Sequence, residues 1–274
     1  MEYNIIDVHS HLFCEEDLAT YQKKARGRVE RSIVIHYKED FNEKPLPLPI
    51  DELLRFTEKH ENLSVIGSVT YTKDIGEQVA ELEPLLKEGR IIGVKMYPGY
   101  EHFYASDGKI VHPVAALCQK YGKPLVFHAG DVLDTEGTAE LTYSYDVALH
   151  VDKLAEHFPD LKIVISHFNF PKFMECANVV CNRKNVYTDI SGTIDAQESP
   201  KDLKQLIKQY CLDLKRALSY FPDVRRKVMF GTDYCSERTS LREFVPYIEV
   251  TENVFTASER KRVFRETAEE VYFS

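Results

Sequence analysis

The sequence lacks the signals of secretion, membrane insertion and nucleic-acid binding. Its start, MEYNIIDVHSHLF, has no basic segment followed by a long apolar core, so we expect no signal peptide. No window approaches the roughly 18 uncharged apolar residues that a transmembrane helix needs. The formal net charge is −9 and the chain has no basic cluster, so neither nucleic acid nor an anionic membrane is an expected partner.

Cysteine is sparse and irregularly placed. The six cysteines include no CxxC pair, and the spacing of Cys176 and Cys181 fits no common zinc-binding pattern. We expect free thiols and, without a secretion signal, a cytoplasmic protein. The Gly-rich phosphate loop of an open doubly wound sheet is also missing after the first strand, which disfavours that fold.

The composition is that of a folded protein of barrel size. The 274 residues are 43% hydrophobic and 29% charged, with no long low-complexity tract, so a large core is expected and disorder is not. α/β barrels of this length are commonly single domains, and no stretch resembles an interdomain linker. We therefore predict one domain over residues 1–274.

Short apolar runs alternate with amphipathic segments along the chain. Most of the runs are continuously apolar, as in strands that are buried on both faces of a parallel sheet. The predicted strands are Tyr3–Val8, Ser32–His36, Leu63–Val69, Ile91–Tyr97, Pro124–His128, Leu161–His167, Asn185–Ile190 and Lys227–Asp233. Helical patterns occupy residues 49–60, with Asp51 as the expected cap, and residues 74–89, 112–122, 144–159, 199–222 and 256–273. This alternation predicts a (β/α)8 barrel.

Ionisable side chains occur at the ends of these predicted strands. Side chains at the C-terminal ends of barrel strands converge on one site, and residues i and i+2 of a strand share a face. Imidazoles and carboxylates are common ligands of zinc and similar metals. The sequence therefore predicts a shared metal site built from His9, His11, Lys95, His128, His167 and Asp233.

Six segments, in this order, resemble the amidohydrolase superfamily of metal-dependent barrel hydrolases, in particular its amidohydrolase-related branch, which also contains decarboxylases. They are DVHSH, GVKMYPGY, PLVFHAGD, PDLKIVISHFN, NVYTDISG and KVMFGTDY, and they span nearly the whole chain. The sequence departs from the family pattern in Tyr234-Cys235 after GTD, in FNFPKF after His167, and in Glu266-Thr267-Ala268 near the C-terminus.

The resemblance and the residue chemistry together suggest roles. His9, His11 and His128 would bind a divalent ion, zinc foremost or manganese, as one or two ions. A bound ion lowers the pKa of water from 15.7 toward about 7, and Asp233 could both ligate it and shuttle the water proton. His167 could ligate a second ion or, as in one-metal relatives, act as an acid or base or polarise the substrate.

Lys95 has three open interpretations. VKMYP resembles the segment of dihydroorotase-like members in which a carbamylated lysine bridges two metals, since a carbamate is an anion. An unmodified Lys95 could instead hold a substrate carboxylate, or form a structural salt bridge.

Substrate contacts are expected from Tyr97 and Tyr100 near the fourth strand and from Arg238 after the eighth. We predict an enzyme, a metal-dependent hydrolase that attacks an amide, lactam, lactone or ester of a small molecule. The alternatives are a decarboxylase of an aromatic or enolic acid, and a non-enzymatic barrel with a vestigial site. The oligomeric state, a homo-oligomer included, stays open.

Overall fold

Parallel strands form a continuous sheet in the computed structural model, which describes residues 4–37, 48–130, 145, 147–194, 199–235 and 244–274. Within these residues the order is β8-β7-β6-β5-β4-β3-β2-β1-β9, and neighbouring strands are parallel. The strands are β1 (Ile5–His11), β2 (Val29–Ile35), β3 (Leu63–Ser68), β4 (Val94–Met96), β5 (Leu125–Phe127), β6 (Ile163–Ile165), β7 (Val186–Asp189), β8 (Val228–Met229) and β9 (Tyr234–Cys235).

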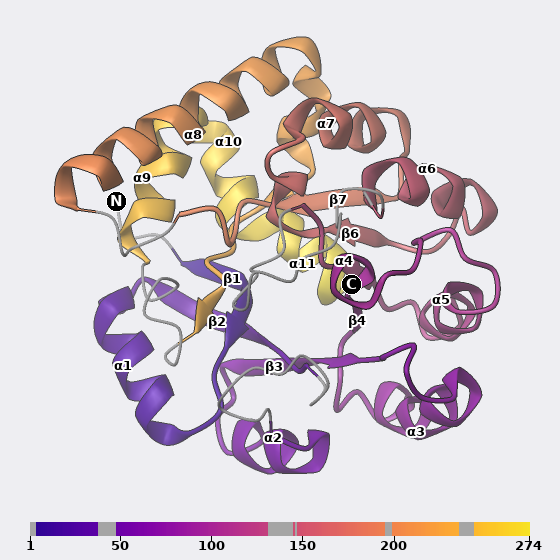
Figure 1. Cartoon of the computed structure of the whole chain (residues 1–274). Coiled ribbons are helices and arrows are strands. Elements are labelled where there is room, and N and C mark those ends of the chain that lie inside the picture. Colours follow the sequence, from indigo (N-terminus) through magenta and orange to yellow (C-terminus); the bar gives the residue numbers. More distant parts are fainter. Residues whose placement is uncertain (1–3, 38–47, 131–144, 146, 195–198, 236–243) are drawn as a thin grey trace.

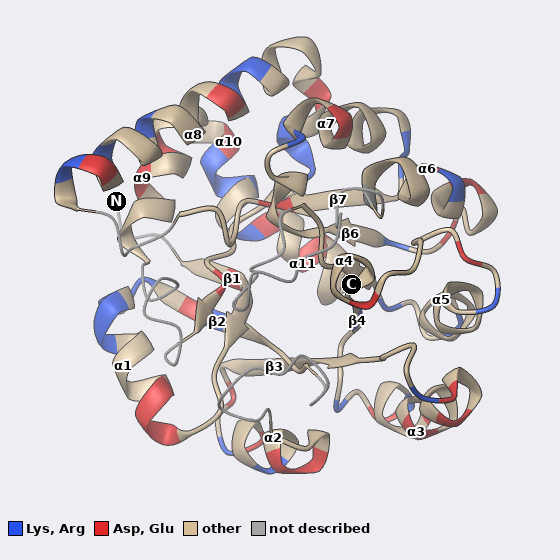
Figure 2. Cartoon of the chain, in the orientation of Figure 1, with Lys and Arg blue, Asp and Glu red and all other residues tan. Residues whose placement is uncertain are grey.

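Helices surround this sheet and cover its outer face (Figure 1). They are α1 (Glu15–Ala25), α2 (Ile50–Thr57), α3 (Ile75–Lys87), α4 (Pro98–Glu101), α5 (Val111–Lys120), α6 (Val147–His157), α7 (Phe173–Asn182), α8 (Pro200–Tyr220), α9 (Val245–Val254), α10 (Ala257–Lys261) and α11 (Thr267–Tyr272). Charged residues are concentrated on the surrounding helices (Figure 2). The predicted barrel fold is confirmed.

Some elements differ from the prediction. Helices α1, α7 and α9 were not predicted, and none of the three has a side-chain cap bond at its first turn, so the capping signal of a helix start is missing. The cap predicted at Asp51 is wrong: Pro49 is the N-cap of α2 and Asp51 lies in its first turn. The two-residue strand β9 is too short to show a periodic pattern.

The barrel interior is filled with apolar side chains, and the C-terminal helix closes one of its mouths. The inner cluster joins strand residues such as Ile6, Val126 and Met229 to Val271 and Tyr272 of α11. Helix α11 lies near the centre of the ring in Figure 1. Lys162, next to the start of β6, donates to the Glu270 carbonyl at 2.6 Å, so α11 covers the N-terminal ends of the strands. A site within the barrel is therefore left to the C-terminal ends.

The first and last strands meet at a seam that closes the barrel. The Val8 amide donates to the Phe230 carbonyl at 3.0 Å, and the Asp233 amide donates to the His9 carbonyl at 2.8 Å. The fully buried carboxylate of Asp7 reinforces this seam. It accepts bonds from the Thr232 hydroxyl at 2.7 Å, the Thr232 amide at 3.1 Å and the Tyr21 hydroxyl at 2.8 Å.

Removing the Asp7 carboxylate should weaken the seam. Asp7→Ala leaves buried donors of Thr232 and Tyr21 without an acceptor, and each such group costs roughly 1–3 kcal/mol. We expect the free energy of unfolding in urea to fall by about 3 kcal/mol. The matched variant Tyr21→Phe, which removes one donor and leaves the carboxylate, should lose about half as much. Equal losses in the two variants would contradict the role of the Asp7 carboxylate as the common acceptor at the seam.

Candidate metal centre

Strand β1 brings His9 and His11 to the C-terminal mouth of the barrel. Between Asp7 and Ser10 the strand advances three residues while β2 advances two, from Ser32 to Val34. Such a bulge re-aims side chains within a strand. The Nε2 atoms of His9 and His11 each lie 3.1 Å from the same oxygen, Oδ1 of Asp233. The predicted convergence of the two imidazoles is therefore present in the structure.

Asp233 is held at this point by the backbone that follows β8. Its φ is +60°, a left-handed conformation that is uncommon for a residue with a side chain, and its amide is anchored to the His9 carbonyl. Burial alone would raise the pKa of Asp233, but the imidazoles of His9, His11 and His167 outweigh burial and lower it. The carboxylate is therefore ionised at neutral pH.

The donor atoms fit a divalent cation. Nδ1 of His11 lies 3.0 Å from the Ile35 carbonyl, which can only accept, so Nδ1 carries a hydrogen and Nε2 is the nitrogen left to bind an ion. Burial, with a further contribution from Lys95, lowers the pKa of His9 to about 3, so this imidazole is neutral. A neutral imidazole nitrogen and an ionised carboxylate oxygen both offer an electron pair, so the three atoms can bind one cation together. Among the described residues, His9, His167 and Asp233 form a cluster whose ligand atoms lie within 4.8 Å of one another.

Lys95 of β4 lies directly beside this cluster. Its side chain is fully buried. Nζ lies 3.1 Å from Nε2 of His9 and donates to the Ser166 hydroxyl at 3.0 Å. Burial lowers the pKa of Lys95 to about 8. Within the described part of the chain no carboxylate forms an ion pair with Nζ, which leaves the structural salt bridge without support.

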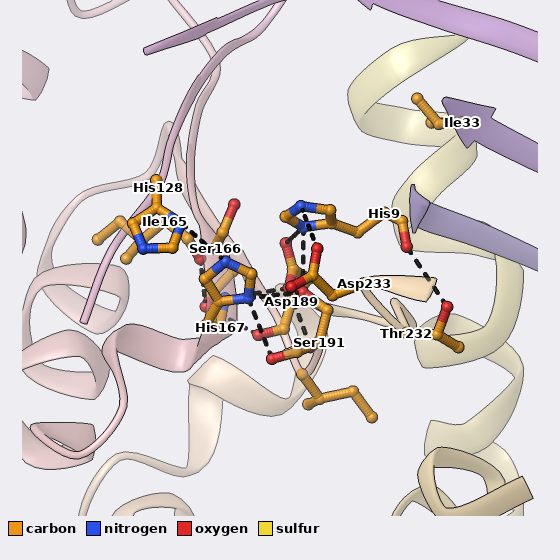
Figure 3. Close-up of polar contacts among 12 residues, drawn as sticks. His9, Ile33, His128, Ile165, Ser166, His167, Asp189, Ser191, Thr232 and Asp233 are labelled. Atoms are coloured by element: carbon orange, nitrogen blue, oxygen red, sulfur yellow. Dashed lines mark hydrogen bonds and ion pairs between the residues drawn. The ribbon is translucent and has the colours of Figure 1, made fainter. Parts of the chain in front are cut away.

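His167 and His128 extend the cluster away from β1. His167 is buried, and its ring centroid lies 4.8 Å from that of His9. Its Nε2 is 3.2 Å from Nδ1 of His128, so His128 lies one imidazole further along (Figure 3). Burial lowers the pKa of His167. The six predicted residues are thus neighbours in the structure, and metal binding by them stays a prediction.

Two of the three predicted substrate residues lie within the described residues, and both are near the cluster. Tyr97 is buried, and its ring stacks on His128 with centroids 5.9 Å apart. The Tyr100 ring lies 4.9 Å from that of His128. Both tyrosines therefore border the outer imidazole of the cluster. Arg238 lies outside the described residues.

Three buried polar residues that contact the cluster were not singled out from the sequence. Asp7 also accepts from the His9 amide at 3.1 Å. Asp189, at the end of β7, and Ser191 contact His9 and His167. A signal was available, because Asp189 and Ser191 follow a strand with the i, i+2 spacing that singled out His9 and His11.

The protein is thus a parallel α/β barrel. A candidate metal centre of imidazoles, a lysine and a carboxylate lies at the C-terminal mouth of this barrel. Residues 51–273 match the family model described as Amidohydrolase. The chain belongs to this family, which confirms the predicted enzyme class and the resemblance drawn from the six segments. The match begins beyond β1, so it does not include His9 or His11. A comparison with curated proteins gives no match.

Several solved structures share the fold. A probable 2-pyrone-4,6-dicarboxylic acid hydrolase from Acinetobacter baumannii is 14% identical, with a TM-score of 0.65 and coverage of 99% of this chain and 100% of the other. An amidohydrolase from Burkholderia multivorans with bound zinc is 17% identical (TM-score 0.65; 98% and 99% covered). The 5-carboxyvanillate decarboxylase LigW from Sphingomonas paucimobilis is 12% identical (TM-score 0.63; 98% and 99% covered).

Two of the other sequence expectations concern thiols and membranes. All six cysteines are free thiols, four of them buried. In the described ranges no helix combines the length and apolar character that a membrane span requires.

Loss of the converging nitrogens should remove the metal. Zinc at 100 times its dissociation constant stabilises a protein that binds it by about 2.7 kcal/mol, so wild type should gain thermal stability on adding zinc and lose it with a chelator. His9→Ala and His11→Ala should abolish this gain and lower the zinc content measured by inductively coupled plasma mass spectrometry.

The control is His112→Ala, because His112 stacks on His157 at a centroid distance of 4.5 Å and belongs to α5 rather than to the cluster. It should retain the zinc of wild type. Wild type without zinc or manganese affinity would contradict the metal centre.

Proposed function

We propose that the protein is a metal-dependent hydrolase that cleaves a carbonyl C–N or C–O bond, in an amide, lactam, lactone or ester, of a small molecule. The observation that carries the proposal is the convergence of two imidazole nitrogens on one carboxylate oxygen, at 3.1 Å each. Family membership and the zinc bound by the Burkholderia multivorans amidohydrolase support the choice of zinc.

His9, His11 and Asp233 would hold the ion, which, when bound, supplies Lewis-acid polarisation and lowers the pKa of water. Asp233 has a second oxygen, Oδ2, in addition to the shared Oδ1. As an ionised carboxylate in the mouth of the barrel, it can accept the proton of the attacking water and pass it to the leaving nitrogen or oxygen. His167, neutral because of its burial, is placed either to join the ligands through Nε2 or to donate or accept a hydrogen bond at the substrate.

Lys95 has two roles compatible with its contacts. As a carbamate it would supply an anionic ligand next to His9, and a pKa of about 8 leaves part of the population as the neutral amine that reacts with CO2. As an ammonium it would hold a substrate carboxylate. Native mass spectrometry of wild type and Lys95→Arg, with and without bicarbonate, separates the two, because only the carbamate adds the mass of CO2.

A decarboxylase is the second candidate. The decarboxylase from Sphingomonas paucimobilis has the same fold at a TM-score of 0.63. The shared oxygen Oδ1 of Asp233 also defines a position for a single ion, as a one-metal lyase requires. Release of CO2 from hydroxybenzoate-type acids, with no hydrolysis of lactones or amides, would favour this candidate.

The activity test uses a panel of lactones, lactams, esters and aromatic acids with the zinc- and manganese-loaded protein. Asp233→Asn should lower kcat by roughly 10²–10⁴, the usual contribution of a positioned acid–base group. The control Asp223→Asn changes an exposed carboxylate next to the start of β8 and should leave kcat within about twofold. A wild-type rate that Asp233→Asn leaves unchanged would exclude Asp233 as the proton shuttle.

A further inference from the structure

Ser191, two residues beyond the end of β7, contacts two imidazoles of the candidate metal centre at once. Its hydroxyl oxygen lies 3.0 Å from Nδ1 of His9 and 2.9 Å from Nδ1 of His167. The same hydroxyl contacts Oδ1 of Asp189. Figure 3 shows Ser191 and Asp189 between the two rings. One hydroxyl group is therefore shared by a carboxylate and two histidines.

The hydrogen of this hydroxyl is donated to Asp189. Oδ1 of Asp189 also accepts the amide hydrogens of His167, at 3.1 Å, and of Ser191 itself, at 3.0 Å, so this oxygen acts as an acceptor. A hydroxyl has one hydrogen and two lone pairs. When Ser191 donates to Asp189, its two lone pairs can only accept hydrogens from the two Nδ1 atoms.

One further contact requires the same arrangement in His167. Nδ1 of His167 lies 3.1 Å from the carbonyl oxygen of Ser191, which cannot donate, so the hydrogen of this ring is on Nδ1. For His9 the assignment follows from the Ser191 hydroxyl alone, because its Nε2 lies 3.1 Å from both Nζ of Lys95 and Oδ1 of Asp233. Both neutral imidazoles are consequently in the Nδ1–H form.

We infer that Asp189 and Ser191 are positioning residues that fix the Nδ1–H tautomer of both His9 and His167, so that both Nε2 lone pairs are available to the cation. The inference rests on the proposed metal dependence of the site. Hydrogen bonds to the non-ligating nitrogen of a metal-binding histidine set its tautomer and ring orientation, and their removal typically weakens metal binding 10- to 100-fold.

The backbone near Asp189 and Ser191 adopts uncommon conformations that place the His167 ring. His167, Phe168 and Asn169 all have positive φ values, +61°, +48° and +55°, a costly run that persists only when its surroundings hold it. Asp189 supplies part of this support by accepting the His167 amide hydrogen. Gly192 follows with φ +70°, and a Cβ atom there would collide with Nδ1 of His167. The segment 189–192 thus leaves space for the His167 ring and no more.

The first test measures tautomers in metal-free protein by long-range ¹H–¹⁵N NMR of the imidazole rings, assigned with His9→Gln and His167→Gln. Wild type should show hydrogens on Nδ1 of both rings. Ser191→Ala removes the shared acceptor and should move His9 toward Nε2–H. A hydrogen on Nε2 of either ring in wild type would overturn the inference, and this readout needs neither substrate nor zinc.

The second test measures zinc affinity by competition with a chelator. Ser191→Ala and Asp189→Asn should bind zinc 10- to 100-fold more weakly than wild type. The matched control is Thr188→Val. Thr188 belongs to the same strand, and its buried hydroxyl donates to the Ile165 carbonyl at 2.7 Å. Thr188→Val should lower the melting temperature and leave zinc affinity within twofold.

The outcomes separate this inference from the proposed function. Wild-type affinity in Ser191→Ala, or an equal loss of affinity in Thr188→Val, would overturn the positioning role. The absence of zinc binding by wild type would instead overturn the proposed function, while the NMR readout still decides the tautomers. Ser191→Thr keeps the hydroxyl. Zinc affinity close to that of wild type in this variant, together with a loss in Ser191→Ala, would show that the hydrogen bond and not the packing of residue 191 is responsible.

Discussion

The seam between the first and the last strands is the constraint on which the rest of the site depends. The Asp233 amide is bonded to the His9 carbonyl, and the Asp233 carboxylate faces the nitrogens of the same strand. Residues separated by more than 200 positions in the sequence therefore become neighbours only when the sheet closes. The buried carboxylate of Asp7 fixes this closure, because it ties β1 to Thr232, the residue before Asp233.

A network of buried hydrogen bonds orients the polar atoms around this seam. Buried polar groups are costly unless they are paired, and here each pairing also directs a second atom toward the cluster. The Ile35 carbonyl takes the hydrogen of His11, and Ser191 takes those of His9 and His167. The barrel thus directs the Nε2 atoms of His9 and His11 toward the Asp233 carboxylate. Such an arrangement suits a cation.

The sequence allowed the fold and the members of the cluster to be predicted, because both follow from local patterns. Continuous apolar runs indicated buried parallel strands, and ionisable residues at their ends indicated a shared mouth. The supporting groups were harder to find. Asp7 lies inside an apolar run and Ser191 resembles a turn residue, and their importance depends on contacts with residues 225 and 182 positions away. The bulge in β1 and the left-handed turn at His167 are tertiary outcomes that no residue pattern specified.

The position of Asp233 also bears on when the site can form during synthesis. His9 and His11 are synthesised before their shared oxygen, which belongs to Asp233, 222 positions after His11. A nascent chain without β8 offers two neighbouring imidazoles but no carboxylate partner from Asp233. Capture of an ion by the complete set of ligands therefore awaits the docking of β8 and does not accompany the folding of β1.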